Sequence, residues 1–92
     1  MARVELTRHL FTFFPALQGR SLAFEVNTVA ELVAALEREA PGIAFYICDE
    51  RGRLRRHVNI FVDEKMVNDR GKLSDPLGND SQVLIMQALS GG

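Results

Sequence analysis

The residues with the most distinctive chemistry are Gly91 and Gly92, which bring the sequence to an α-carboxylate. An α-carboxyl group has a pKa of about 3.3–3.7, so at neutral pH it is ionised and a poor electrophile until it is activated. Because glycine has no Cβ atom, this end can adopt backbone angles closed to other residues, and no branch crowds the terminal carbonyl. The two glycines therefore suit threading into a narrow channel, with the carboxylate itself as the reacting group.

The side chains offer no comparable reactive set. His9 and His57 fall on different expected strands without the spacing of metal ligands, so we expect no bound metal. Asp63 and Glu64 are adjacent on an expected turn, and turn chemistry explains them better than an acid–base pair. Cys48, the single cysteine, cannot form an intramolecular disulfide, and its apolar neighbours indicate a small buried hydrophobic residue. The side chains therefore predict that the chain is not an enzyme.

A local basic cluster lies between residues 51 and 57. It could hold a phosphate or an acidic loop of a partner. Asp49 and Glu50 precede it, which favours a solvated surface loop. The whole chain has 11 basic and 12 acidic residues and a formal net charge of -1, so we expect neither nucleic acid nor an anionic membrane as a partner. The members of the cluster are Arg51, Arg53, Arg55, Arg56 and His57.

Size and composition indicate one globular domain. The chain has 92 residues, of which 47% are hydrophobic and 25% charged, and this composition argues against disorder. The apolar stretch at residues 10–17 is interrupted by Thr12 and Pro15 and is too short to span a bilayer. Because the N-terminus shows no signal-peptide pattern, we expect a cytoplasmic protein. We divide the chain into a folded body, residues 1–89, and an expected flexible diglycine tail, residues 90–92.

Alternation of apolar and polar residues predicts a set of short strands. The first strand is predicted at residues 3–7, and we expect the stretch 10–17 to extend or end it, with a turn at Pro15 and Gly19. The second strand, residues 22–26, should pair with the first as an antiparallel hairpin. Further strands are expected at residues 57–62, 66–67 and 83–86.

The clearest element is a helix that starts at Thr28 and stops at Pro41-Gly42. Thr28 and Glu31 fit a capping box, in which both side chains satisfy free backbone amides. A helix between two strands suggests a right-handed crossover that joins parallel neighbours. Because one amphipathic helix can cover only one face of a sheet, we predict a two-layer α+β domain. The apolar stripe of the helix consists of Val29, Leu32, Val33, Leu36 and Ala40.

Three parts of the sequence together resemble one known family: residues 57–62, the later segment with Leu73, Leu77 and residues 79–83, and the terminal Gly91-Gly92. They resemble the ubiquitin-like β-grasp fold and its prokaryotic sulfur carriers, and the resemblance spans essentially the whole chain. Those carriers include the small subunit of molybdopterin synthase, the thiamine-biosynthesis sulfur carrier and the carrier of a cysteine-biosynthesis pathway. The extended loop at residues 49–56 makes the chain most similar to the molybdopterin and cysteine branches.

The resemblance implies that Gly92 is the working group. In the family, an E1-like adenylating enzyme uses ATP to convert the terminal carboxylate into an acyl-adenylate. A sulfur donor then displaces AMP and leaves a thiocarboxylate, which gives its sulfur to a synthase in cofactor or cysteine biosynthesis. The chain is then a co-substrate that binds no cofactor itself, while ATP belongs to the activating enzyme.

The predicted sheet also leaves apolar residues on the face away from the helix. Alternation places Phe61, Leu84 and Met86 there, and exposed apolar patches often mark interaction sites. We therefore expect these residues, together with Ser90 in the tail, to contact partner proteins. The alternatives are a loop that covers the residues, or a register shifted by one residue, which would exchange the two faces.

Two hypotheses of different class remain open at this point. The first is the sulfur carrier, whose terminus is consumed and regenerated. The second is a ubiquitin-like modifier or interaction module, whose diglycine end forms an isopeptide bond to a lysine. A small enzyme is a third and weaker hypothesis, because the sequence offers no catalytic set.

Overall fold

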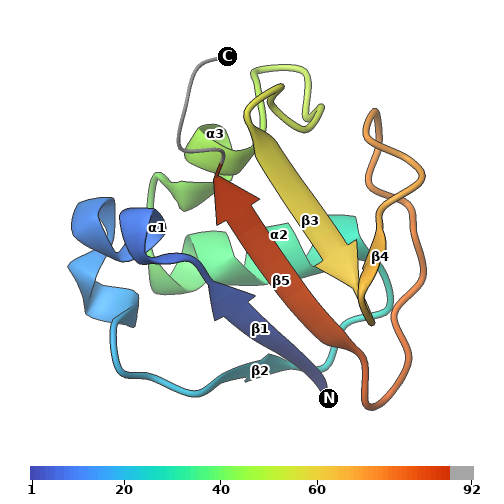
Figure 1. Cartoon of the computed structure of the whole chain (residues 1–92), viewed down its shortest axis with the longest axis horizontal. Coiled ribbons are helices and arrows are strands. Elements are labelled where there is room, and N and C mark those ends of the chain that lie inside the picture. The colour runs from blue at the N-terminus through green and yellow to red at the C-terminus, as the bar shows by residue number, and fades with distance from the viewer. Residues whose placement is uncertain (88–92) are drawn as a thin grey trace.

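The first and last strands of the chain lie side by side at the centre of one mixed sheet. The computed structural model describes residues 1–87, and its five strands are ordered β2-β1-β5-β3-β4 (Figure 1). β1 runs parallel to β5, whereas the other neighbouring pairs are antiparallel. Helix α2 lies behind the sheet in Figure 1 and leaves the face toward the viewer uncovered. The elements in chain order are β1 (Ala2–Leu6), α1 (Arg8–Phe13), the 3-10 helix η1 (Pro15–Leu17), β2 (Leu22–Phe24), α2 (Val29–Glu39), α3 (Ile43–Ile47), β3 (Val58–Val62), β4 (Lys65–Met66) and β5 (Gln82–Gln87).

The connection between β1 and β2 is helical, which corrects the strand and turn predicted for residues 10–17. α1 and η1 follow each other in this segment. Leu10, Phe14 and Leu17 recur at helical spacing; the two leucines are fully buried, and Phe14 packs against the core. The aromatic residues of this run have a high strand propensity, but burial of the helical stripe outweighs it. The predicted antiparallel pairing of the first two strands is confirmed.

Helix α2 forms as predicted, with Thr28 at its N-cap. The Thr28 hydroxyl accepts a hydrogen bond from the Glu31 amide at 3.2 Å. The Glu31 carboxylate in turn accepts one from the Asn27 amide at 2.8 Å, so both side chains satisfy free amides at the start of the helix. The apolar stripe faces the sheet, and its buried members are Val29, Leu32, Val33, Leu36 and Ala40.

The end of α2 is fixed by a glycine and a carboxylate. Gly42 has a φ of 102°, in the left-handed region that a residue without Cβ adopts at low cost. The Glu37 carboxylate accepts hydrogen bonds at 2.9 Å from the amides of both Gly42 and Ala44. These bonds favour the ionised form and lower the pKa of Glu37. The turn therefore leads directly into α3.

The strand order differs from the predicted crossover between parallel neighbours. β2 and β3, which flank α2 in sequence, run in the same direction but have β1 and β5 between them. The β1–β2 and β3–β4 pairs each leave one inner edge unpaired, and β5 bonds to both edges at once. This closure leaves only β2 and β4 at the edges, and these are the shortest strands of the sheet.

The long connection between β4 and β5 is held to the core at two leucines. Leu73 and Leu77 are buried. The Leu73 carbonyl accepts a hydrogen bond from the Ala30 amide at 2.9 Å, and the Leu77 amide donates to the Asn27 carbonyl at 2.8 Å. The connection therefore packs against the start of α2, and it brings the chain back to begin β5 at the centre of the sheet.

Candidate functional site

The described chain ends at Gln87, the last residue of the central strand β5. Gln87 pairs with Val58 of β3, and its amide donates to the Thr7 hydroxyl at 3.4 Å. The Tyr46 hydroxyl donates to the Gln87 side-chain carbonyl at 2.8 Å. The end of β5 is thus held by β3, by the residue after β1 and by α3. The predicted reactive residues Gly91 and Gly92, and the predicted contact Ser90, lie outside the described residues.

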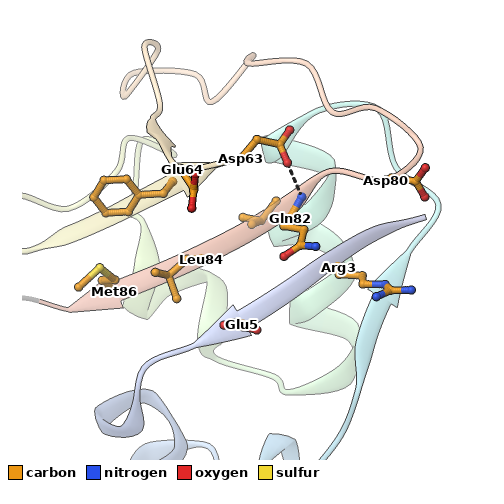
Figure 2. A pocket seen from close by; sticks show the side chains of 10 residues that line it. Arg3, Glu5, Asp63, Glu64, Asp80, Gln82, Leu84 and Met86 are labelled. Carbon is orange, nitrogen blue, oxygen red and sulfur yellow. Dashed lines mark hydrogen bonds between the residues drawn. The ribbon is translucent and has the colours of Figure 1, made fainter.

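The outer face of the sheet, opposite α2, carries a row of side chains across four strands. The register pairs Glu5 with Leu84, Leu84 with Phe61, and Phe61 with Met66. Met86 follows two residues after Leu84 on the same face of β5 (Figure 2). The structure therefore places the predicted residues Phe61, Leu84 and Met86 together on the face that α2 does not cover. Their contact with partners stays a prediction.

Met66 belongs to this row, and the sequence analysis missed it. The return strand was expected at residues 66–67, but it covers Lys65–Met66. A turn made of Asp63 and Glu64 alone fixes the register, since it sets Lys65 opposite Val62 and Met66 opposite Phe61. Both turn residues have positive φ angles, 49° and 71°, as a type I′ hairpin requires. Counting from that turn could have placed Met66 on the outer face.

Phe61, Met66, Leu84 and Met86 together form what we call the outer patch. These side chains remain accessible in the folded chain. Met66 is 51% exposed and Met86 is 36% exposed, and Phe61 and Leu84 are half-buried. By contrast, their sequence neighbours Ile60 and Ile85, whose side chains point to the other face of the sheet, are fully buried. Each Å² of apolar surface left in water forgoes about 25 cal/mol of burial energy. A cluster of this kind on one face is typical of an interaction surface.

A groove of about 690 Å³ runs over three residues of the outer patch, with Phe61, Leu84 and Met86 in its floor and charged residues around it. Asp63 is tied to β5, because its carboxylate accepts from the Gln82 amide at 2.9 Å and its amide donates to the Gln82 carbonyl at 2.8 Å (Figure 2). Asp63 therefore serves turn chemistry, as predicted. The charged residues that line the groove are Arg3, Glu5, Asp63, Glu64 and Asp80.

Cys48 is a buried hydrophobic residue, as the sequence predicted. It is 6% exposed and belongs to the hydrophobic core. Burial raises the pKa of its thiol, and the nearby Asp49 carboxylate adds to the increase. A thiol with a raised pKa is a poor nucleophile at neutral pH, so Cys48 offers no reactive sulfur of its own.

The basic cluster is partly used within its own loop. Arg53 lies 3.7 Å from the Asp49 carboxylate, which also accepts from the backbone amides of Arg51 and Arg53. Arg55 stacks over the Phe45 ring, 4.7 Å from its centroid, and its Nε donates to the Phe45 carbonyl at 2.8 Å. These contacts favour the interpretation of the cluster as a structured surface loop over that of a phosphate site.

Within residues 1–87, His, Cys, Asp and Glu side chains form no group of three or more that could hold a metal ion. None of the described helices has the length and apolar character needed to cross a membrane.

Comparisons of sequence and of structure with known proteins agree on one family. The ThiS family matches residues 9–92 of this chain. Sulfur carrier protein CysO of Mycobacterium tuberculosis is 29% identical over 75 residues, which cover 79% of this chain and 81% of that protein. The crystal structure of M. tuberculosis CysO superposes with a TM-score of 0.82 at 26% identity, covering 97% of this chain and all of that one.

Two further solved structures share the fold. A chain of the BexX/CysO complex of Amycolatopsis orientalis has a TM-score of 0.83 at 25% identity, and both chains are covered completely. SAMP1 of Haloferax volcanii has a TM-score of 0.77 at 18% identity, covering 99% of this chain and 98% of that one. The second likeness is one of fold alone. Together these structures confirm the predicted two-layer β-grasp architecture.

Proposed function

Because the chain belongs to the ThiS family, we propose that it carries sulfur as a thiocarboxylate on its C-terminal residue, Gly92. The observation that carries this proposal is the extent of the family match, which runs through residue 92 and so includes Gly91 and Gly92. The similarity to CysO, a sulfur carrier protein, points the same way. The chain supplies the acyl group, and its partners supply catalysis.

The chemistry takes place at one carbon atom. A carboxylate oxygen of Gly92 attacks the α-phosphorus of ATP in an activating enzyme, and pyrophosphate leaves. Sulfide then attacks the acyl carbon, and the bond to AMP breaks. The product is a thiocarboxylate, whose sulfur attacks the acceptor's substrate. Water then cleaves the acyl–sulfur bond, so the sulfur stays on the acceptor's substrate and the carboxylate is restored. ATP is the activating enzyme's substrate, so this chain needs no cofactor of its own.

The fold's contribution is to position that carbon relative to a docked partner. Gln87 is fixed at the end of the central strand, and five residues follow it in the sequence. At about 3.4 Å per residue, they reach at most ~17 Å. We propose that Phe61, Leu84 and Met86 bind the activating enzyme and that Ser90 contacts the entrance of its channel. That enzyme's active site must then lie within this reach of the end of β5.

Intact mass spectrometry tests the proposal. The full chain, incubated with ATP, sulfide and the activating enzyme of the same organism, should gain the mass difference between sulfur and oxygen. A matched variant with one alanine added after Gly92 should gain nothing, because an unreactive amide replaces the carboxylate at that glycine. No gain by the unmodified chain, with an enzyme shown to adenylate another carrier, would contradict the proposal.

The same experiment separates the sulfur carrier from a protein modifier. SAMP1 of Methanosarcina acetivorans is a small archaeal modifier protein with the same fold, at 18% identity and a TM-score of 0.78. If this chain is a modifier, it will appear as an adduct on lysines of other proteins in a lysate supplied with ATP. Thiocarboxylate without such adducts supports the carrier.

A further inference from the structure

We infer that the groove on the outer face selects partners by charge, and that it binds a partner segment in which lysine or arginine side chains adjoin an apolar anchor. The inference rests on the proposed function, because that function assigns a docking partner to this face. It adds which side chains the partner must carry.

The floor of the groove accounts for the apolar anchor. Phe61 and Leu84 are directly opposite each other, and Met86 follows two residues after Leu84 on the same face. Methionine side chains are unbranched and polarizable, so they can adapt to the shape of an inserted side chain. A floor of this kind, half-buried at its centre, fits one or two apolar side chains of a partner.

The walls of the groove account for the positive charge. Four carboxylates line it, from Glu5, Asp63, Glu64 and Asp80, against one guanidinium, from Arg3. The ion pairs within residues 1–87 are Arg20–Glu39 and Arg53–Asp49, so an ion pair neutralises none of these four groups in the part of the chain described. The groove therefore presents an excess of negative charge beside an apolar floor.

The neighbouring cations do not cancel this excess. Lys65 is on the same hairpin, but it pairs with Val62 and so lies on the opposite face from Phe61 and Met66. The N-terminal ammonium group donates to the Asn79 carbonyl, beside Asp80, and with Arg3 it reduces the negative charge at that end. A net negative groove remains.

The charges and the apolar floor lie next to each other along β5. Asp80 and Asp63 lie near the start of the strand with Arg3 and the N-terminal ammonium group, whereas Glu5 pairs with Leu84 midway along it (Figure 2). The cations of the partner segment should therefore adjoin its apolar anchor.

Charge reversal in the groove tests the inference. Glu64→Lys and Asp80→Lys should each lower kcat/KM for adenylation several-fold at low salt, through KM and with kcat unchanged, because charge complementarity acts mainly on association. The loss should shrink as salt is added. Glu50→Lys is the matched control, since it makes the same change of charge at an exposed glutamate in the loop after α3. Thermal unfolding verifies that each variant is folded.

Equal effects of Glu64→Lys and Glu50→Lys would overturn the inference while leaving the proposed function in place, because the unmodified chain would still be adenylated. A concentration-dependent dimer that Glu64→Lys dissociates would also overturn it, since a second copy would then be the occupant. If the unmodified chain is not adenylated by an enzyme active on another carrier, the proposed function itself fails.

Discussion

The two faces of β5 carry equally apolar residues, but only one face is fully buried. Val83 and Ile85 point toward α2 and are 2% and 0% exposed. Leu84 and Met86 point the other way; Leu84 is half-buried, and Met86 is 36% exposed. The domain has one main helix, so it covers one face of the sheet and leaves the other to water. Hydrophobicity on the inner face therefore serves folding, whereas hydrophobicity on the outer face is available for binding.

The largest expected effect separates the two faces by stability. Ile85→Ala should lower the free energy of unfolding by about 2–5 kcal/mol, because it removes buried methyl groups and leaves a cavity beneath α2. Leu84→Ala, on the neighbouring residue of the same strand, should cost about 1 kcal/mol or less, because its side chain is only half-buried in the folded chain. Urea denaturation of both variants measures the difference. Similar losses would mean that the outer face is also part of the core.

The second effect separates the faces by binding. Phe61→Ala should lower kcat/KM for adenylation by about tenfold or more, the loss expected when an aromatic anchor at the centre of an interface is truncated. Phe45→Ala is the control, because Phe45 is 61% exposed on α3 and lies outside the outer patch. Circular dichroism and thermal unfolding confirm that both variants fold. Equal losses of kcat/KM in the two variants would mean that the activating enzyme docks on another surface.

The faces of the strands and the main helix could be predicted because their signals are local. Period-two alternation at residues 57–62 and 83–86 placed Phe61 and Leu84 on one face, and register confirms it. The capping box at Thr28 set the start of α2 for the same reason. The reactive glycine, by contrast, came from the resemblance, since two glycines at a terminus identify no chemistry by themselves.

The strand order and the β1–β2 connection could not be predicted, because their causes are not local. β5 is inserted between β1 and β3 only because two hairpins leave matching inner edges, and no short segment encodes that choice. Leu10 and Leu17 adopt helical spacing in a run whose residues favour strands, and burial against distant elements decides it. Met66 was missed because its face depends on the length of one turn.

A smaller effect on stability is expected at α2, the helix that covers the inner face of the sheet. Thr28→Ala should destabilise the domain by about 1 kcal/mol, because the Glu31 amide at the start of α2 loses its acceptor. Thr12→Ala, on the exposed side of α1, is the matched control and should change stability by a few tenths of a kcal/mol at most. Equal losses in denaturant midpoint would show that the cap contributes nothing to the inner layer.

The smallest expected effect is on the pH dependence of stability. It concerns the connection between β4 and β5, which buries Leu73 against α2. The Asp69 carboxylate accepts hydrogen bonds from the Ser74 hydroxyl and from the amides of Lys72, Ser74 and Gly71, which lower its pKa. At neutral pH the group is ionised in both folded and unfolded chains. As the pH falls below about 3.9, the ordinary Asp value, the unfolded chain binds a proton first, so stability declines until the lower folded pKa is passed.

Asp69→Asn should therefore reduce the decrease in unfolding free energy at acid pH. Urea titration at several values between neutral and acid pH measures this decrease. Ser74→Ala should reduce it partly, because the Ser74 hydroxyl is the largest single cause of the lowered pKa. Both variants leave the outer patch intact, so adenylation at neutral pH should keep its KM. An unchanged decrease in Asp69→Asn would contradict this role for Asp69. A changed KM would mean that the connection beneath the sheet also shapes the docking face, and the separation between the two faces would no longer hold.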